Sequence, residues 1–274
     1  MRAVPSTLLK IKPLDPWLPS LLRRYAKLFK HRYSVERRQG ALFMLDQSSK
    51  VDRNLLLKGA WEPDNIALIK ALMMRYAGAS RRIFLDIGAH GAFYAILCAK
   101  ELAFDRIVIV EADPSNVAKI HANLLLNGLA GKAEVLHAVA SGAPGEIAFN
   151  IATDSSRSHF GAGAGTPSPI AETMKVPAVV IDQAVAERGA CLIAKVDVEG
   201  HELEVLDGME DLLKNNYGVL QIECLGANVK PLHARMSALG YIFHRVVLSD
   251  HFFVKDSSAT AGQDAKFETP EAVT

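Results

Sequence analysis

The chain has 274 residues, a formal net charge of +1 and 50% hydrophobic residues. This composition excludes a disordered or fibrous protein and predicts one large folded domain, alone or with an appendage. The charge is unevenly distributed, because residues 1–58 hold 13 Lys and Arg against 4 Asp and Glu, whereas residues 59–274 hold 18 against 26. The acidic body argues against a broad nucleic-acid-binding surface, so we expect no nucleic-acid partner.

The basic segment 1–58 is predicted to be an N-terminal arm. From residue 17 to residue 33 its apolar side chains recur every three or four positions with Lys and Arg between them, which indicates a basic amphipathic helix. This helix would dock onto the rest of the chain, or onto a second copy in a homodimer, or it would lie on a membrane surface. Residues 41–47 follow as a short lead-in strand.

Two features of the sequence bear on the compartment. Lys10, Lys12 and neighbouring prolines interrupt the apolar stretch at the N-terminus of the sequence. The stretch is therefore not expected to be a signal peptide or a membrane-spanning helix. Cys98, Cys191 and Cys224 lie in apolar runs without paired spacing, so we expect core thiols and no disulfide or zinc site. We therefore expect a cytoplasmic protein, peripheral to the inner face of the membrane if the N-terminal helix binds lipid.

Strand-like and helix-like segments alternate from residue 59 to residue 255. This order is typical of a parallel sheet covered by helices on both faces. We predict a Rossmann-like, doubly wound α/β domain over 59–255, with a mostly parallel seven-stranded sheet and an antiparallel terminal strand. Residues 256–274 lack apolar periodicity and are predicted to be a disordered tail. The predicted strands are 83–86, 106–113, 133–141, 146–152, 175–182, 191–198, 218–224, 241–246 and 251–255, and the predicted helices are 64–76, 92–102, 114–126 and 202–213.

The turn after the first core strand, LDIGAHGAFY, is the expected ligand site. In an open α/β sheet, ligands bind beyond the carboxyl ends of the strands, and this turn is the usual cradle. Gly88 and Gly91 allow the backbone to pass close to a ligand, and the following helix offers free N–H groups to a carboxylate or phosphate. Asp86 would accept a hydrogen bond from an ammonium group of the ligand, or it would stabilise the loop by bonding to its backbone. The sequence leaves both roles open.

Glu111 ends the second core strand, 20 residues after Gly91. A carboxylate in that place accepts hydrogen bonds from the two ribose hydroxyls of an adenosine cofactor. Glycines are also found in tight turns that bind no ligand, because the turn conformation itself requires them. The glycine-rich loop alone is therefore weak support for a cofactor site. The dinucleotide pattern G-x-G-x-x-G and a Walker sequence are both absent, which disfavours NAD and ATP.

Five segments stand in this order along the chain: LDIGAHGAFYAILCAK, IVIVEADPSNVAKIHANLLLNG, VPAVVID, AKVDVEGHELEVLDGM and LQIEC. Together they resemble the FkbM-type methyltransferases over residues 42–255, and KVDVEGHE is the most specific part. The resemblance implies a class I methyltransferase fold and S-adenosylmethionine as methyl donor. It also implies, in most cases, O-methylation of a sugar, polyketide or other small molecule, so we expect a small-molecule or glycan acceptor.

The resemblance assigns roles to positions in the loop and at two strand ends. The loop of this chain departs from the family, which commonly has Asn, an aliphatic residue and Gly where this chain has His90, Gly91 and Ala92. Glu111 matches the ribose carboxylate, and Ser141 matches the end of the third strand near the adenine. The predicted cofactor-binding residues are Asp86, Gly88, Ala89, His90, Gly91, Glu111, Ala112 and Ser141.

The acidic motif after the fourth core strand supplies the predicted catalytic residues Asp197, Glu199 and His201. Methyl transfer to an alcohol requires alignment of the nucleophile and loss of the hydroxyl proton, and a carboxylate or imidazole can take that proton. Asp197 is the first choice for the group near the sulfonium. As an alternative to catalysis, Glu199 and Glu202 would stabilise the start of the following helix through its dipole. His201 would then be a solvated histidine in the first turn of that helix.

Three further interpretations concern this region. Lys195 lies in an apolar strand and needs a partner, for which Glu223 is the suggested acidic neighbour. No dedicated metal site is predicted, although Mg²⁺ held by Asp197, Glu199 and Glu223 is a disfavoured alternative. The loop 154–168, rich in small residues, would be a mobile lid or a solvated connector, and its suggested substrate contacts are Ser156, Arg157 and His159.

The favoured function is an S-adenosylmethionine-dependent O-methyltransferase. A non-catalytic scaffold that keeps the fold is the alternative from another class, motivated by the altered loop at His90 to Ala92. An NAD-dependent oxidoreductase is disfavoured because the third glycine is missing. Specificity for the acceptor is expected to lie in the variable loops.

Overall fold

The computed structural model describes residues 32–152, 159–160 and 170–257. Nearly all of the helix predicted over 17–33 and of the predicted tail lies outside these residues. Ser156 and Arg157 of the predicted substrate loop also lie outside them, and His159 is described for its backbone only. No helix among the described residues is long and apolar enough to cross a bilayer.

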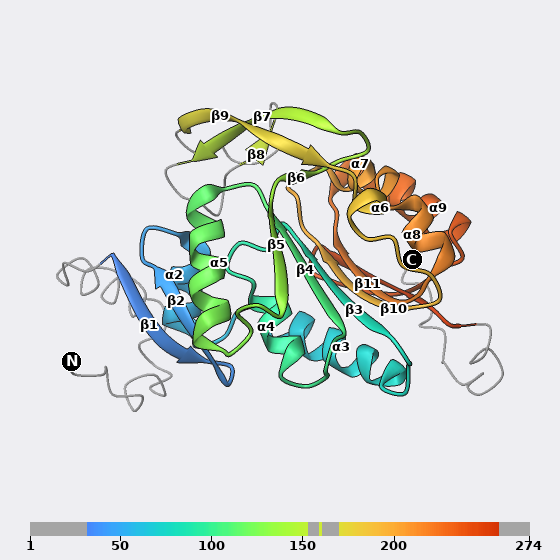
Figure 1. Cartoon of the computed structure of the whole chain (residues 1–274), viewed down its shortest axis with the longest axis horizontal. Coiled ribbons are helices and arrows are strands. Elements are labelled where there is room, and N and C mark those ends of the chain that lie inside the picture. The colour runs from blue at the N-terminus through green and yellow to red at the C-terminus, as the bar shows by residue number, and fades with distance from the viewer. Residues whose placement is uncertain (1–31, 153–158, 161–169, 258–274) are drawn as a thin grey trace.

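Seven strands form the central sheet, in the order β12-β13-β11-β10-β3-β4-β5 (Figure 1). The neighbours β5, β4, β3, β10 and β11 run parallel, whereas β13, the last of the described strands, runs antiparallel to β11 and β12. The predicted Rossmann-like, mostly parallel sheet with an antiparallel terminal strand is therefore confirmed. The strands are β3 (Arg82–Ile87), β4 (Arg106–Glu111), β5 (Ala133–His137), β10 (Cys191–Val196), β11 (Tyr217–Glu223), β12 (Ile242–Val247) and β13 (Asp250–Lys255).

Helices cover both faces of this sheet because each inner strand buries side chains on both sides. In β3, Phe84 joins one apolar cluster, whereas Ile83 and Leu85 join the other. The first cluster contains α3 (Pro63–Met73), α4 (Phe93–Ala99) and α5 (Pro114–Leu126). The second contains α6 (Ile181–Ala184), α7 (Glu202–Asp207), α8 (Glu210–Asn215) and α9 (Val229–Ala238). Short 3-10 turns lie at Met74–Tyr76 and Gly226–Asn228.

An N-terminal unit packs against α5. It consists of β1 (Tyr33–Arg38), β2 (Ala41–Asp46) and α2 (Lys50–Lys58), and Phe43 joins the same apolar cluster as α3 and α4. Asn123 of α5 accepts from the Met44 backbone N–H at 2.7 Å, and Asn127 both accepts from and donates to the backbone of Leu42. These side chains fix β2 along the helix, so the unit is anchored to the domain by backbone contacts as well as by apolar packing.

A second, four-stranded sheet lies at the carboxyl end of the central sheet (Figure 1). It contains β6 (Val139–Ala140), β7 (Gly145–Ala152), β8 (His159–Phe160) and β9 (Ile170–Val179). The prediction of one strand over 133–141 was wrong, because this run divides between β5 and β6. The Ala138 N–H still bonds to the Glu111 carbonyl, but β4 ends there, and the chain then pairs with β9.

The predicted helix 202–213 is also divided, into α7 and α8. Asp182 causes the division, since its carboxylate accepts from the backbone N–H groups of Asp211 and Leu212 and so caps a new helix. Gly208 lies at the break, where its backbone touches Ser141. Elsewhere, α4 ends at Ala99 rather than at residue 102, and the predicted helix 64–76 ends in a 3-10 turn.

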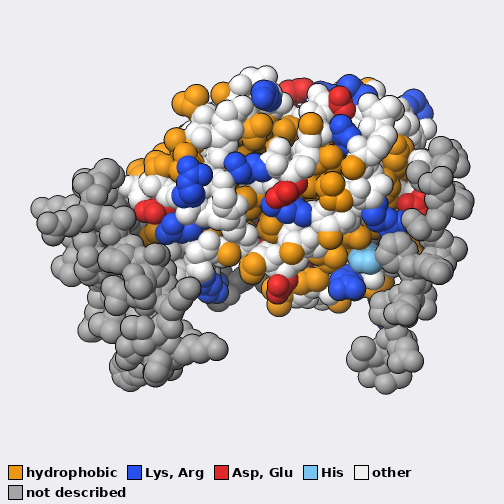
Figure 2. Space-filling view, turned by 90° about the horizontal axis from the view of Figure 1, so that it is seen from below, with side chains coloured by type: hydrophobic (Ala, Val, Ile, Leu, Met, Phe, Trp, Pro, Cys, Tyr) orange, Lys and Arg blue, Asp and Glu red, His pale blue; other side chains and the backbone are white. Residues whose placement is uncertain are grey.

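Two further features of the fold are the composition of one surface and the state of the cysteines. On the face turned away from the four-stranded sheet, Lys and Arg side chains are interspersed with hydrophobic ones (Figure 2). The three cysteines are free and buried, so the prediction of core thiols is confirmed.

Substituting Gly208 tests the close contact that sets the break between α7 and α8. A Cβ built there would lie 2.1 Å from the Ser141 carbonyl oxygen, so Gly208→Ala must displace backbone. We expect a loss of about 2–3 kcal/mol in the free energy of unfolding, measured by urea denaturation. The control is Gly78→Ala, whose Cβ would meet nothing within 4 Å, with an expected change within about 0.5 kcal/mol. Equal effects of the two substitutions would contradict the assigned contact.

Candidate functional site

Polar side chains replace apolar ones where three neighbouring strands reach their carboxyl ends. Asp86 of β3, Lys195 of β10 and Gln221 of β11 lie side by side in the strand register. Alternation along each strand places them on the face whose earlier positions are apolar. Asp197 and Glu223 stand two residues further along β10 and β11, and so on the same face. The carboxyl edge of the sheet therefore carries a row of ionisable groups in an otherwise apolar layer.

Lys195 is the buried cation of this row. Its ammonium group lies 2.9 Å from the Asp250 carboxylate and 3.1 Å from Asp197. Burial disfavours the charged lysine, but these two carboxylates hold the pKa of Lys195 well above its usual range. The predicted ion pair with Glu223 was wrong, because Asp197 and Asp250 are the groups within bonding distance of the ammonium group.

Asp197 and Glu223 form a carboxyl pair that is hydrogen-bonded side chain to side chain. The charge of Asp197 and burial raise the pKa of Glu223 to about 9, while Lys195 and this hydrogen bond hold the pKa of Asp197 below its usual value against the effect of burial. The pair thus holds one proton near neutral pH, on Glu223. Asp197 is left as a carboxylate with 29% of its side chain exposed.

A hydrogen-bonded network lies behind this pair, beneath α3 and α4. Gln221 donates to the Asp250 carboxylate and to the Tyr94 hydroxyl, each at 2.8 Å, and Tyr94 donates to Glu62 at 2.5 Å. Asn65 donates to the other oxygen of Asp250 at 2.7 Å. These contacts fix Asp250, and through it the position of Lys195.

The glycine-rich loop touches the end of β10. Gly88 has a left-handed backbone with φ of 76°, and a Cβ built there would lie 1.8 Å from the Asp197 carbonyl oxygen. The Asp197 N–H also donates to the Ile87 carbonyl at 2.9 Å. Glycine is therefore required at position 88 for the approach of loop to strand, and this approach brings the predicted cofactor loop to the predicted catalytic residue.

The altered part of the loop takes an unexpected backbone. Its left-handed residues are His90, with φ of 52°, and Ala92, with φ of 56°, rather than Gly91. Such a conformation costs a non-glycine residue about 1–2 kcal/mol, and it persists where neighbours hold it. Gly91 is needed for space, because a Cβ there would lie 2.8 Å from the Phe93 ring.

Glu111 and Asp86 are buried carboxyl groups beside the loop. Glu111 accepts from the backbone N–H of His90 on one oxygen and of Asp113 on the other, both at 2.8 Å, and burial raises its pKa. Asp86 accepts from the Ala95 N–H in α4 at 3.0 Å, and burial raises the pKa of Asp86 to about 7. This bond supports the bracing role that the sequence left open for Asp86.

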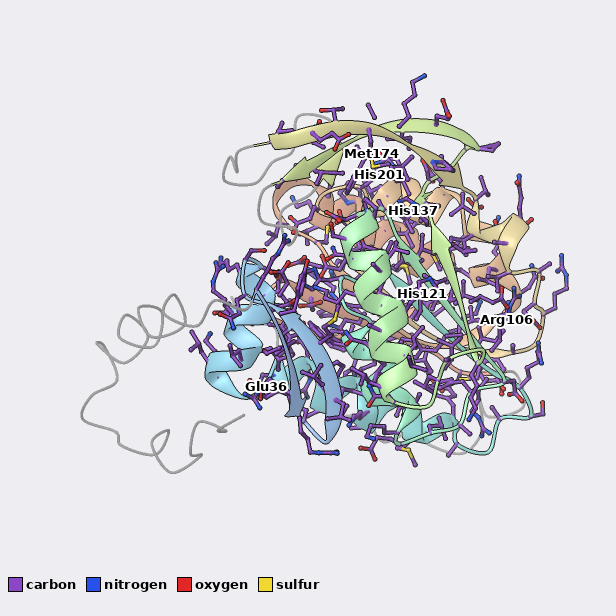
Figure 3. All side chains as sticks on the ribbon, turned by 60° about the vertical axis from the view of Figure 1, so that its left-hand side comes forward. Glu36, Arg106, His121, His137, Met174 and His201 are labelled. Atoms are coloured by element: carbon purple, nitrogen blue, oxygen red, sulfur yellow. The ribbon has the colours of Figure 1, made fainter. Side chains whose placement is uncertain are left out.

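The remaining predicted site residues surround these groups. Ser141 follows β6, with its hydroxyl 3.2 Å from Nε2 of His201, and burial lowers the pKa of His201. His201 lies below the four-stranded sheet, toward the same end of the molecule as His137 (Figure 3). Glu199 is exposed, with a left-handed backbone at φ of 54°. Ala89 is buried, and the Ala112 carbonyl lies 3.0 Å from the ring of His137.

A family model described as Methyltransferase FkbM domain matches residues 86–243, more than half of the chain. The chain belongs to this family. The predicted membership of the FkbM-type methyltransferase family is thus confirmed. A comparison with curated protein sequences gave no match.

Several solved structures are similar to this FkbM methyltransferase. An FkbM methyltransferase from Methylobacillus flagellatus KT is 14% identical with a TM-score of 0.46, over 87% of this chain and 60% of that one. The precorrin-6y C5,15-methyltransferase of Geobacter metallireducens GS-15 is 14% identical with a TM-score of 0.41, over 70% and 86%. M. jannaschii TYW2, solved in complex with AdoMet, is 13% identical with a TM-score of 0.39, over 83% and 88%. This chain thus spans 60% of the length of the Methylobacillus structure, and the family assignment rests on the domain match.

Some site residues of this FkbM methyltransferase were not identified from its sequence. Asp250 and Tyr94, which hold the Lys195 network, lie far from Lys195 along the chain, and their signal is only a polar group beside an apolar run. Glu202 turns back to accept from the Gly200 N–H at 2.8 Å, so it supports the motif's own backbone. Among the described residues, no three His, Cys, Asp or Glu side chains form a group suited to a metal ion, and the Mg²⁺ alternative gains no support.

The proton on Glu223 predicts a pH dependence of stability. The unfolded chain releases this proton near pH 4 and the folded protein near pH 9, so this stabilisation is present at low pH and is lost as pH rises toward 9. Glu223→Gln mimics the protonated form. We therefore expect the variant to lose less stability between pH 5 and pH 8, and to exceed the parent protein at pH 8 by about 1–2 kcal/mol in urea denaturation.

The control for this measurement is Glu172→Gln, at an exposed position in β9. It should leave the pH dependence of the parent protein unchanged. An equal loss of stability in the Glu223→Gln variant and the parent would show that Glu223 is ionised in the folded protein at neutral pH.

Proposed function

We propose that this FkbM methyltransferase transfers the methyl group of S-adenosylmethionine to a hydroxyl oxygen of a small molecule or glycan. The observation that carries this proposal is the Asp197 carboxylate, which is partly exposed at the end of β10, 3.1 Å from the Lys195 ammonium group and hydrogen-bonded to Glu223. Such a group can orient a hydroxyl and accept its proton. The cofactor, when bound, supplies an electrophilic methyl group on a positively charged sulfur.

The residues present fit the adenosine part of this cofactor. Each oxygen of Glu111 accepts one backbone N–H, and a carboxylate oxygen has a second lone pair with which to accept a ribose hydroxyl. Glu111 would therefore hold the ribose, and the backbone of Gly88 to Gly91 would border the methionine portion. The Asp197 carboxylate, at the strand end that Gly88 touches, provides the negative charge that suits a sulfonium.

Proton transfer in the proposed reaction falls to Asp197. The hydroxyl group of an alcohol becomes strongly acidic as its oxygen bonds to the methyl carbon, so even a carboxylate whose pKa is below its usual value can take the proton. The hydroxyl proton passes to Asp197 and then to water, and the donor, when bound, would keep the electron pair of its carbon–sulfur bond as a neutral thioether. Lys195 keeps Asp197 ionised before the reaction, and Glu223 holds the carboxylate in place by its hydrogen bond.

The charges at this edge support a neutral hydroxylated acceptor. The carboxylates of Asp197 and Asp250 both lie against the ammonium group of Lys195, so this group of three carries a net negative charge, and a further carboxyl group, Glu62, lies behind Tyr94. A phosphate or carboxylate acceptor would meet like charge here. A cytoplasmic location, a homodimer and contact of the N-terminal helix with a membrane remain predictions.

Asp197→Asn tests the proposed proton transfer. With a panel of sugars, polyketides and phenols as acceptors, we expect kcat to fall by about 10²-fold or more, because the amide cannot accept the proton. Binding of S-adenosylmethionine should change far less.

Glu199→Gln and His201→Asn test the other two predicted catalytic residues, and Asp64→Asn on the exposed start of α3 is the control. Unchanged turnover by Asp197→Asn would remove Asp197 as the base, and binding without turnover on any acceptor would favour the scaffold.

Glu111→Ala tests the cofactor site. Calorimetric titration should show S-adenosylmethionine binding at least about 10-fold more weakly than to the parent protein, since a buried acceptor for two hydroxyls is lost. NAD is the control ligand, and we expect no binding of it to either protein. Binding of NAD but not S-adenosylmethionine would overturn the cofactor assignment.

A further inference from the structure

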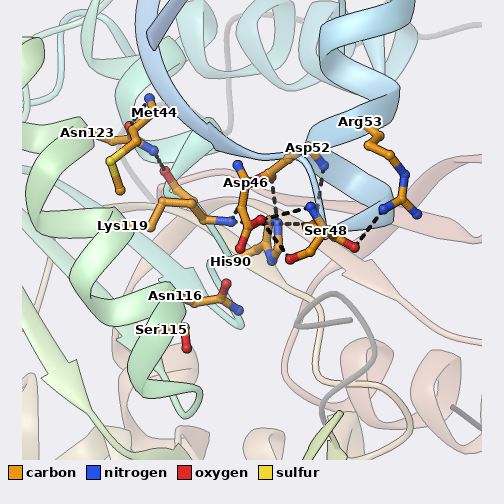
Figure 4. A network of polar contacts seen from close by, with 12 residues as sticks. Met44, Asp46, Ser48, Asp52, Arg53, His90, Ser115, Asn116, Lys119 and Asn123 are labelled. Atoms are coloured by element: carbon orange, nitrogen blue, oxygen red, sulfur yellow. Dashed lines mark hydrogen bonds and ion pairs between the residues drawn. The ribbon is translucent and has the colours of Figure 1, made fainter. Parts of the chain in front are cut away.

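The left-handed backbone of His90 is held at three points. Its N–H donates to Glu111, the following carbonyl, that of Gly91, accepts from Asn123 at 2.9 Å, and its ring lies in a polar cluster (Figure 4). In that cluster, Nε2 of His90 is 2.8 Å from Asp52 and 2.9 Å from Lys119. The ring is thus fixed by two helices, α2 and α5, neither of which belongs to the loop.

Asp52 and Lys119 make a buried ion pair. Their side chains are 0% and 3% exposed, and their charged atoms lie 2.9 Å apart. Burial would raise the pKa of Asp52, but the hydrogen bond to His90 and the charges of His90 and Lys119 hold this pKa at about 2. The Asp52 carboxylate is therefore available as an acceptor for the ring at neutral pH.

Either tautomer of His90 has a strong partner in this cluster. A proton on Nε2 is donated to the Asp52 carboxylate, and a lone pair on Nε2 accepts from the Lys119 ammonium group. The Ser49 hydroxyl, 3.3 Å from Nε2, is a further neighbour. In either tautomer, Nε2 therefore has one matching hydrogen-bond partner in the cluster.

The helix that carries Asp52 is itself fixed. The Asp46 N–H donates to Asp52 at 2.8 Å, and β2, which ends at Asp46, is bound along α5 by Asn123 and Asn127. Asn123 thus contacts both β2 and the loop. This N-terminal unit precedes the region matched by the family model, which begins at residue 86.

We propose that Asp52, His90 and Lys119 are positioning residues that set the affinity for S-adenosylmethionine, by holding the loop backbone whose N–H orients Glu111. The inference rests on the proposed cofactor site. It assigns the N-terminal unit a part in cofactor binding. His90 acts through Glu111 and needs no contact of its own with the cofactor.

Two variants of His90 separate this role from backbone strain. Asparagine tolerates the left-handed conformation better than other non-glycine residues but is too short to reach Asp52. Glutamine is less tolerant of that conformation, but its amide reaches about as far as Nε2. Both variants leave the Asp52 and Lys119 ion pair intact, whereas removing either partner would leave a buried charge unpaired.

Calorimetric titration of the full chain with S-adenosylmethionine is the first measurement. We expect the dissociation constant to rise at least about 10-fold in His90→Asn and to stay within about 3-fold of the parent in His90→Gln. The control is His121→Asn, at an exposed position on α5, with an unchanged constant. Binding by His90→Asn that equals or exceeds that of His90→Gln would overturn the proposal, because backbone tolerance alone would then explain the affinity.

Hydrogen–deuterium exchange of the unliganded chain is the second measurement. Peptides covering residues 86–95 should exchange at least about 10-fold faster in His90→Asn than in the parent or His90→Gln, with peptides from β12 and β13 unchanged. Equal exchange in the three proteins would overturn the positioning role. If the parent protein bound no S-adenosylmethionine, the proposed cofactor site would fail, and exchange would still decide whether the cluster holds the loop.

Discussion

The arrangement of ionisable groups at the carboxyl edge of the sheet depends on the buried charge of Lys195. An ammonium group in an apolar layer is costly unless carboxylates surround it, and Asp197 and Asp250 supply that charge. Asp250 is in turn fixed by Asn65 and Gln221, so the requirement extends from the sheet to α3. The ionisation of Asp197 and the proton on Glu223 are therefore consequences of one buried cation and its neighbours.

The sequence predicted the central sheet well, because its cause is local. Runs such as IFLD and CLIAKV are apolar at every position except Asp86 and Lys195, which indicates strands buried on both faces, and they became β3 and β10. The position of Glu111 was likewise predictable from its distance to the glycine loop. Its two backbone donors depend only on the turn that follows β3 and on the start of α5.

The features that were missed or wrong depend on distant contacts. Asp52 and Lys119 are 67 positions apart, and nothing in either helix indicates that they meet. The division of 133–141 into two strands follows from β4 ending at Glu111, and the division of 202–213 follows from Asp182, on a helix of its own. A single sequence specifies each segment, whereas these pairings arise only when segments assemble.

Glycine at position 88 has one more consequence. With no side chain between them, the loop at Gly88 and the end of β10 touch backbone to backbone, and the hydrogen bond from Asp197 to Ile87 joins them. No rotamer can change the spacing of two main chains in contact. The loop of the proposed cofactor site and the proposed base, Asp197, therefore share one rigid frame, and the freedom needed to admit different acceptors would have to come from other parts of the molecule.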